Sequence, residues 1–415
     1  MSQPQFFKFF ETRIQNPSIF QQIFFNRFNQ KRFINVHPDC LIIYEYGMKL
    51  TRLYKKYKPT YKDGLFDFIR HMVYLCTSFY WMYVLKNSVY CVIPVLVTGL
   101  LQVKTFIIFH DCGHMSYTPN KTLNYVIGII SGILIATPFS WKLGHAVHHV
   151  TNGNRENKYE HHANETVFHT VQQYKNMSYP RRKIYAFVRH PLIFFTIIPF
   201  VKFTIGYRFH ALRFRKRKTL GKINPVFIIA DQIINNVGFI SLYYWTYIQG
   251  IFIHFTAVAT LATSIGIMLF HCQHTFNPSY AGDNNSWNNK DSSVIGSSFI
   301  KIPWFLKYFT GHIEYHHAHH LNSKIPHYFL GDFHDDVVMY TDLFDNVPTM
   351  TLMDCLSNLK YTLYDDKLGK YVTFPSALKR KYIMVKYGKY EERVFIQRYF
   401  MGHDRRTRER NGPCR

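Results

Sequence analysis

The chain has 415 residues, of which 47% are hydrophobic, 18% are aromatic and only 18% are charged, and its formal net charge is +25. A soluble protein of this length would usually carry more charge and would divide into two or three domains. The apolar residues instead gather in a few long runs, which is typical of an integral membrane protein. The seven cysteines are dispersed and form no CxxC pair, so neither a disulfide framework nor a zinc knuckle is indicated, and a reducing compartment fits.

Two apolar runs in the first part of the chain predict a helical hairpin. Residues 72–84 are uncharged, and residues 89–109 are interrupted only by Gln102 and Lys104. Both runs are near the length that crosses about 30 Å of hydrocarbon, given some tilt or extension into the interface. His110 follows the second run directly, so we expect that helix to continue out of the lipid.

Histidines recur at helical spacing in three clusters. The later members of each cluster stand three or four positions after the first, so on a helix their rings project from one face. Chance accounts poorly for three such clusters, even in a chain with 23 histidines. Imidazole is the commonest neutral metal ligand, so these eight rings predict a site for more than one transition-metal ion. The eight histidines are His110 and His114, then His145, His148 and His149, then His316, His319 and His320.

A second hairpin is predicted at residues 226–247 and 248–270. Its first arm contains Asp231, which would be costly facing lipid and is expected to face the helix bundle or the site. We interpret residues 123–139 as interfacial or re-entrant, because a crossing there would separate the first two histidine clusters across the membrane. A fifth span is the alternative for that stretch. Residues 192–201 are too short to cross alone.

Basic residues are distributed unevenly about these spans. The connections inside the two hairpins carry only Lys86, whereas residues 208–222 and the tail from 379 to 415 carry many. The positive-inside rule therefore places both termini and all three clusters on the cytoplasmic side. The net charge favours anionic headgroups and an acidic soluble partner. Nucleic-acid binding is disfavoured, because no stacking or groove-reading motif accompanies the charge.

The ligand types favour iron over zinc. Zinc would be saturated by four ligands, and the predicted ligand set consists of imidazoles without a Cys thiolate. Two iron ions sharing these rings would each keep open positions, which oxygen activation requires. An oxidant at the lipid boundary, above an apolar tunnel into the hairpins, suits an unactivated C–H bond of an alkyl chain. A membrane metal-binding or transport protein is the alternative from another class, but it predicts ligands near the bilayer centre rather than at the ends of the spans.

The residues around the clusters resemble the membrane fatty acid desaturases, in particular the acyl-lipid branch with delta-12 (omega-6) and omega-3 enzymes. A further match lies between residues 351 and 374, so that the resemblance extends over residues 66–374. The stretches that carry it are KTFIIFHDCGH (104–114), WKLGHAVHH (141–149) and GHIEYHHAHHLNSKIPHY (311–328).

This resemblance implies a di-iron enzyme that couples the reduction of O2 to the removal of two vicinal hydrogens. The product would be a cis double bond in a membrane lipid-linked acyl chain. Electrons would come from cytochrome b5 or ferredoxin with its reductase, since the chain carries no nicotinamide, nucleotide or haem motif of its own. A fatty acyl hydroxylase or acetylenase on the same scaffold is the alternative within this class.

The resemblance also implies which residues hold iron. The eight cluster histidines would be ligands, joined by a histidine just after the last span, which His274 matches best. Asp111 would orient a ligand imidazole through its free N–H, although it could equally cap a helix or pair with a surface lysine. His271 could compete with His274, and His312 and His317 are extra imidazoles beside the third cluster. Exposed or simply hydrogen-bonded rings are expected at His161, His162, His169 and His327.

Together these features predict an all-α integral membrane protein. Four transmembrane helices would form two hairpins, with interfacial helices and a cytoplasmic helical cap that carries the histidine-rich di-iron site. Residues 1–65 would be a cytoplasmic N-terminal region, residues 66–374 the desaturase domain and residues 375–415 a basic tail. The membrane would be the endoplasmic reticulum if the source is eukaryotic.

Overall fold

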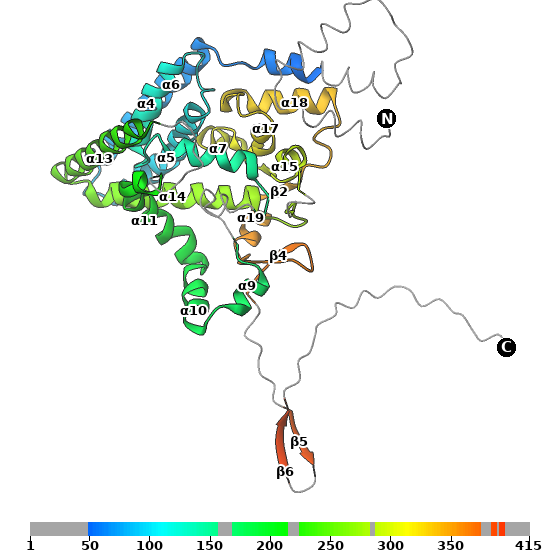
Figure 1. The fold of residues 1–415 in the computed structure, drawn as a ribbon. Coiled ribbons are helices and arrows are strands. Elements are labelled where there is room, and N and C mark those ends of the chain that lie inside the picture. The colour runs from blue at the N-terminus through cyan, green and yellow to red at the C-terminus, as the bar shows by residue number, and fades with distance from the viewer. Residues whose placement is uncertain are drawn as a thin grey trace, which may run out of the picture.

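A computed structural model describes residues 49–156, 168–214, 224–282 and 287–374, together with two strands at 383–387 and 390–394. This part of the chain is mostly helical (Figure 1). Its longer helices are α4 (Tyr61–Val84), α5 (Val92–Gly113), α6 (Lys121–Leu134), α7 (Trp141–Thr151), α10 (Tyr179–Val188), α13 (Pro225–Ile248), α14 (Phe252–His274) and α18 (Leu330–Tyr340). The shorter ones are α9 (Val171–Asn176), α11 (Ile198–Thr204), α12 (His210–Phe214), α15 (Asn289–Ile295), α16 (Trp304–Thr310), α17 (His316–Leu321) and α19 (Leu352–Asn358).

The expectation of an all-α protein is wrong in one respect, because three short two-stranded sheets accompany the helices. β1 (Phe299–Lys301) pairs in parallel with β2 (Thr349–Thr351), and β3 (Leu363–Asp365) pairs antiparallel with β4 (Lys370–Val372). The third sheet is the hairpin of β5 (Ile383–Tyr387) and β6 (Tyr390–Val394). Strands of three to five residues are too short to show the alternation by which a sequence reveals them.

Three helices in the described residues are long and apolar enough to cross a membrane: Val89–Gly113, Pro225–Ile248 and Phe252–His274. They correspond to three of the four predicted spans. The fourth predicted span lies in α4. Because the first half of α4 carries Asp63, Asp67 and Arg70, this helix is not among those apolar enough to cross a membrane. A bent pair of helices, Tyr179–Val188 with Ile193–Thr204, would be a further span or a re-entrant loop, since it turns by 64° at its break. α6, at 14 residues, is short for a crossing, in agreement with its interfacial interpretation.

α5 lies at the centre of the helical bundle. It contacts α4, α6, α14 and α16. Of the apolar stretch that contains α5, 61% is buried inside the protein, whereas the buried share of the corresponding stretch is 22% in α13 and 22% in α14. The outer helices therefore present most of their apolar side chains outward, as lipid-facing helices do.

Polar caps position the ends of these helices. Asn224 accepts from the backbone N–H of Val226 at the start of α13, and Pro225 follows at the first helical position. α13 and α14 are joined through Gly250, whose φ of 71° is a left-handed value that glycine adopts without strain. The ammonium of Lys86, in the connection between α4 and α5, donates to the carbonyl of Gln249 at 2.8 Å. This contact ties the tips of the two hairpins together at a helix C-terminus, where a cation is favourable.

The helices that bear the histidine clusters converge at the C-terminal ends of α5 and α14, away from the contact of Lys86 with Gln249. In Figure 1, α7, α15 and α17 lie close together there, with α18 beyond them. Contacts of α15 with both α7 and α17 hold this layer together. The fold thus brings residues from four separate parts of the chain to one place.

Candidate metal centre

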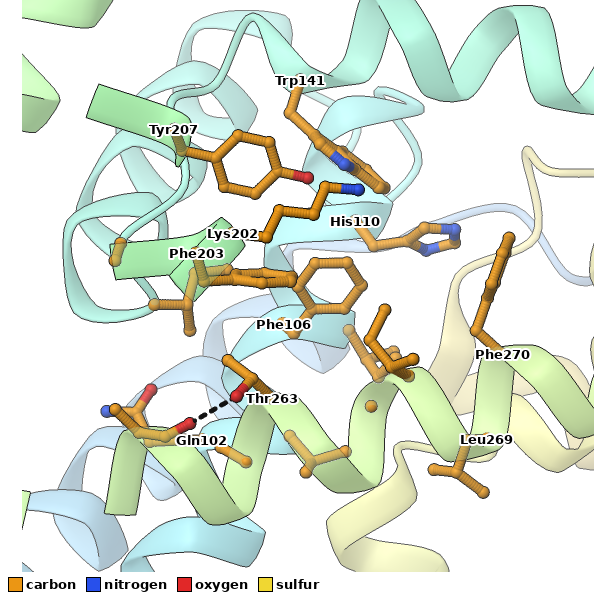
Figure 2. Close-up of a pocket in the computed structure, with 18 of the residues that line it drawn as sticks. Gln102, Phe106, His110, Trp141, Lys202, Phe203, Tyr207, Thr263, Leu269 and Phe270 are labelled. Carbon is orange, nitrogen blue, oxygen red and sulfur yellow. Dashed lines mark hydrogen bonds between the residues drawn. The ribbon is translucent and has the colours of Figure 1, made fainter. Parts of the chain in front are cut away.

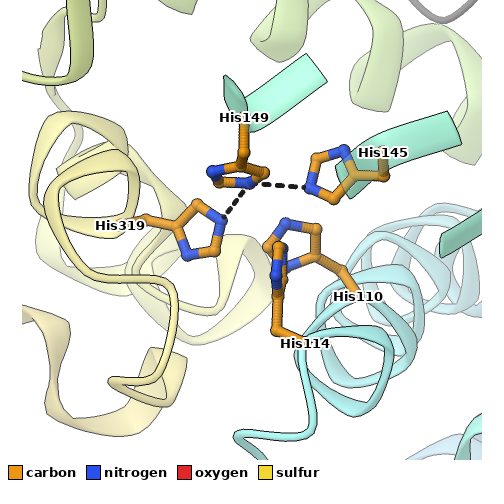
Figure 3. Close-up of side chains that lie close together, drawn as sticks. All are labelled: His110, His114, His145, His149 and His319. Carbon is orange, nitrogen blue, oxygen red and sulfur yellow. Dashed lines mark hydrogen bonds between the residues drawn. The ribbon is translucent and has the colours of Figure 1, made fainter. Parts of the chain in front are cut away.

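Nine histidines form two adjacent groups at the ends of α5 and α14. Within each group, the candidate ligand nitrogens all lie within 4.8 Å of one another. Figure 3 shows the first group, with its rings turned toward a common centre. These are the nine histidines that the sequence and its family resemblance single out. The first group is His110, His114, His145, His149 and His319, and the second is His148, His274, His316 and His320.

Two helices contribute to both groups. On α7, His149 belongs to the first group and its neighbour His148 to the second. On α17, His319 belongs to the first group and its neighbour His320 to the second. The rings of His149 and His320 stack with centroids 4.3 Å apart, so the two groups share a boundary. The arrangement is suited to two metal ions held side by side.

A backbone reversal before α17 places its histidines. Gly311 and His312 both have left-handed φ values, 54° and 56°, and they end α16 before the short turn that leads into α17. A Cβ added to Gly311 would lie 3.0 Å from Ile107 on α5, so this reversal packs directly against the central helix. His312 occupies the reversal itself and is outside both groups.

The spacing of the ring nitrogens fits a shared cation better than hydrogen bonds. His274 Nε2 lies 3.2 Å from His148 Nε2 and 2.9 Å from His316 Nε2. His316 Nε2 in turn lies 3.1 Å from His320 Nε2. An imidazole nitrogen carries one hydrogen or one lone pair. If these contacts were hydrogen bonds, the single hydrogen or lone pair on Nε2 of His274 would have to serve both neighbouring nitrogens. Two nitrogens at right angles about a metal about 2.1 Å away would be about 3 Å apart.

The rings are also in the form that binds a metal. Burial lowers the pKa of His148, His316 and His320 well below the usual value, and the neighbouring imidazoles lower it further. The same causes lower the pKa of His145 and His319. These imidazoles are therefore neutral at physiological pH and keep a lone pair for coordination.

Asp111 lies behind the first group. Its Oδ1 accepts from Nδ1 of His110 at 3.1 Å, which leaves Nε2 of His110 facing the group. Its Oδ2 accepts from both the backbone N–H and Nδ1 of His327, at 2.6 and 2.8 Å. Asp111 is fully buried, and among the described residues its carboxylate pairs with His110 and His327 rather than with a surface lysine, one of the two alternatives to its predicted role.

His327 joins Asp111 to a second buried carboxylate. Its Nε2 lies 3.2 Å from Asp67 Oδ2, and Asp67 Oδ1 pairs with the buried ammonium of Lys104 at 2.7 Å. The hydroxyl of Tyr117 also donates to Asp67. The expectation of a hydrogen-bonded ring at His327 is confirmed, but its position next to the ligand shell was missed. The sequence feature that could have revealed this network is Lys104, a charged residue inside an apolar run, because a buried ammonium requires a buried partner.

The pair of carboxylates makes the stability of the protein sensitive to His327 and to pH. Burial opposes the charged ring, yet the hydrogen bonds to Asp111 and Asp67 raise the pKa of His327 above its ordinary value. We expect His327→Gln to lower the free energy of unfolding by about 3 kcal/mol, because it leaves the buried carboxylate of Asp111 without its charged partner, whereas Asp67 keeps Lys104. The difference from wild type should be full below about pH 6.5 and should shrink as the pH rises through the raised pKa of the folded state.

Thermal unfolding of the purified variants across this pH range measures the effect. His169→Gln is the matched control, because within the described part of the chain the ring of His169 contacts Gln173 and Tyr185 near the surface and neither buried carboxylate. A destabilisation by His327→Gln that did not change with pH would contradict a charged His327.

Two further histidines near the clusters, His271 and His317, have partners outside the two groups. His271 is fully buried, and its Nε2 contacts the carbonyl of Asn358 at 3.1 Å. His317 contacts His334 through ring nitrogens 2.9 Å apart. Neither takes a place in the groups, so His274 is the histidine of α14 that the fold brings to the site. His161 and His162 lie outside the described residues.

An apolar cavity runs from the two groups along α5 and α14, as the sequence predicted. His110, His145, His148 and His316 line one end of it, and Figure 2 shows how Phe106, Phe203 and Phe270 form its walls. Gly144 on α7 and Gly266 on α14 also line it, and a Cβ added to either would meet no atom within 4 Å. The cavity therefore offers an apolar chain direct access to both groups.

Comparison with known proteins gives a consistent result. The fatty acid desaturase family matches residues 86–342. A fatty acid desaturase of Bacillus subtilis (strain 168) is 31% identical over 283 residues, which are 68% of this chain and 76% of that protein.

More distant similarity extends to two further named relatives. The sn-1 acyl-lipid omega-3 desaturase (ferredoxin) of Synechocystis sp. is 26% identical over 239 residues, 56% of this chain and 63% of that protein. The Delta(12) fatty acid dehydrogenase of Crepis alpina is 23% identical over 296 residues, 64% of this chain and 68% of that protein. With the family match covering more than half of its length, the chain belongs to the fatty acid desaturase family, whose members are oxygen-dependent oxidoreductases of fatty acids.

Proposed function

We propose that this protein introduces a cis double bond into a membrane lipid-linked acyl chain, at a delta-12 (omega-6) or omega-3 position. The observation that carries the proposal is the cavity, which is apolar along its walls and is lined at one end by histidines of both groups. An acyl chain in this cavity would lie against the two metal sites without passing a charged group of α5 or α14. The names of the omega-3 and Delta(12) relatives support the choice of position.

The nine histidines are proposed to hold two iron ions. The fit rests on the donor set: neutral imidazoles, nitrogen spacings near 3 Å in both groups, and buried ligand atoms such as Nε2 of His114 that have no hydrogen-bond partner among the described residues. When bound, the irons would supply the oxidising power of O2. The chain's own contribution is to orient the ligands through residues such as Asp111 and to hold the acyl chain in a dry cavity.

A separate protein is proposed to supply the electrons. The Synechocystis and Nostoc relatives carry ferredoxin in their names, which favours a ferredoxin-type donor, with cytochrome b5 and its reductase as the alternative. The net charge of +25 suits an acidic partner of this kind.

We further propose the multi-pass topology of the sequence analysis, with the metal sites and both termini on the cytoplasmic side. The convergence of both groups at the same ends of α5 and α14 supports it, because one face of the membrane then bears the whole site. The desaturase domain would span residues 66–374, between an N-terminal region and a basic tail.

Expression in yeast with a supplied electron donor tests the activity. We expect gas chromatography–mass spectrometry to show a new diene or triene in the lipids, with the double-bond position read from the same spectra. A hydroxylated product would support the hydroxylase alternative. Bound metal without any change in the lipids would support the metal-binding alternative instead.

A variant at the boundary of the two groups makes the test specific. His149→Ala is expected to abolish the new product, because Nε2 of His149 lies within 3.1 Å of both His145 Nε2 and His319 Nε2. His169→Ala should retain it, since His169 is outside both groups. Equal loss in the two variants would contradict the ligand set.

A further inference from the structure

The cavity changes character along its length. Next to the metal groups its walls are formed by side chains such as Phe106, Ile267 and Phe270. Farther along α5, eight residues before His110, Gln102 projects into it (Figure 2). A rise of 1.5 Å per residue places Gln102 about 12 Å below His110 along the helix. The cavity continues past Gln102 to Phe255 and Tyr243, near the closed end of the second hairpin.

Gln102 is a buried polar residue with no hydrogen-bond partner in the described part of the chain. Its side chain is only 4% exposed, and among the described residues neither Oε1 nor Nε2 has a hydrogen-bond partner. The hydroxyl of Tyr243, deeper in the cavity, is likewise buried and has no hydrogen-bond partner among them. Thr263 lines the same wall but differs, because its hydroxyl donates to the carbonyl of Ala259 on its own helix at 2.8 Å.

The polar groups nearer the metals do not share this property. Lys202 and Tyr207 also line the cavity, beside Trp141 in Figure 2, but both have interaction partners within the protein. His210, which also lines the cavity, has an interaction partner as well. Apart from the candidate ligands His148 and His316, the described cavity-lining side chains with unpartnered polar atoms are therefore Gln102 and Tyr243, in the deep half.

A hydrocarbon chain and a water molecule affect such groups oppositely. A methylene against the amide of Gln102 would strip it of water and offer no hydrogen bond, which is costly. Water in the deep half can bond to the amide and the hydroxyl, and buried polar cavities are where ordered water is found. The shallow half has no such group on α5 or α14 and gains by taking up alkyl carbons.

We propose that Gln102, with Tyr243 behind it, keeps the deep half of the cavity hydrated and so sets how far the methyl end of the acyl chain enters. The methyl end stops at the level of Gln102. The depth of the apolar half then decides which carbons lie beside the metal sites, so Gln102 is a determinant of double-bond position. This inference rests on the proposed desaturase function.

The test compares product isomers in the yeast assay. Gln102→Leu and Gln102→Leu/Tyr243→Phe make the deep half apolar with little change in side-chain volume. We expect the wild type to form one positional isomer. In the variants, a second isomer should make up at least a tenth of the product, and its double bond should lie at least one carbon farther from the methyl end. Thr263→Val is the matched control and should leave the isomer unchanged, because it removes a hydroxyl already satisfied by its own helix.

Each outcome has a distinct meaning. If the wild type forms no new double bond, the proposed function fails; if it does and both Gln102 variants form only the wild-type isomer, this inference fails. Loss of product from both Gln102→Leu and Gln102→Met at full iron content would also overturn it, because the amide would then contact the substrate directly. The inference would also be overturned if the variants changed the preference between saturated and unsaturated acyl chains while the position of the new double bond stayed the same.

A binding measurement gives a readout apart from catalysis. For a series of alkyl ligands bound to the purified full-length protein, affinity should rise about fourfold per methylene until the chain reaches Gln102, and then level off. In Gln102→Leu the plateau should move to longer chains. A plateau at the same length in both proteins would contradict the hydrated stop.

Discussion

Replacing His274 by alanine is expected to abolish double-bond formation and to remove about half of the bound iron, because the second group loses one of its four imidazoles. The first group keeps all five of its histidines and should retain its metal. His274 is the last residue of α14, and its Nε2 contacts both His148 and His316, so no other residue in its group can take its place without moving the helix. Iron per polypeptide and fatty acid profile, measured on the same preparations, check both parts.

His271→Ala is the control that makes this prediction sharp. His271 lies three residues earlier on the same helix and is just as buried, but its ring contacts the carbonyl of Asn358. Its replacement should lower stability by about 1–3 kcal/mol through the lost hydrogen bond and leave the iron content intact. Loss of iron from His271→Ala, with retention in His274→Ala, would reverse the assignment of the ninth ligand.

Gly266→Leu is expected to lower desaturation roughly a hundredfold while the protein keeps its iron, because a displaced chain no longer presents its carbons in line with the metal sites. Gly266 lines the cavity, and an added Cβ there would meet only open space, so the leucine side chain would occupy the volume meant for the acyl chain. Unfolding is not the expected cause, since leucine is a better helix former than glycine by about 1 kcal/mol.

A leucine elsewhere on the helix provides the comparison. Ala257 is exposed on α14 and does not line the cavity, so Ala257→Leu should change neither activity nor iron content. The two main variants should therefore differ in iron content: His274→Ala loses activity and about half of its iron, and Gly266→Leu loses activity alone. Full activity in Gly266→Leu would show that the acyl chain does not use this cavity.

The nine histidines could be predicted because their signal is local. Spacings of three and four residues indicate which rings share one face of a helix, and this does not depend on how the rest of the chain folds. The resemblance then added His274, which has no cluster of its own. Their division into two groups could not be predicted, since His148 and His149 are neighbours in sequence and separate only when α17 and α14 pack against α7.

The network behind the ligands was missed for the opposite reason. His327 and Asp111 are 216 positions apart, and Lys104 and Asp67 are 37 apart, so nothing in the local pattern joins them. Each residue had an ordinary interpretation when taken alone. The spans were predicted where composition is decisive, in α5, α13 and α14, and less well in α4, where apolar and charged residues share one helix.

The two groups share α7 and α17, and this has a consequence for how the protein acquires its metals. The first ion to bind would fix the rotation of both helices and so bring the remaining histidines of the second group into register. In the wild-type protein the first ion should thus favour binding of the second, whereas a variant such as His274→Ala can load only the first group. Inserting one residue within the histidine cluster of α7 or α17 would turn rings away from both ions at once, whereas an insertion within α14 would displace His274 alone, a ligand of the second group.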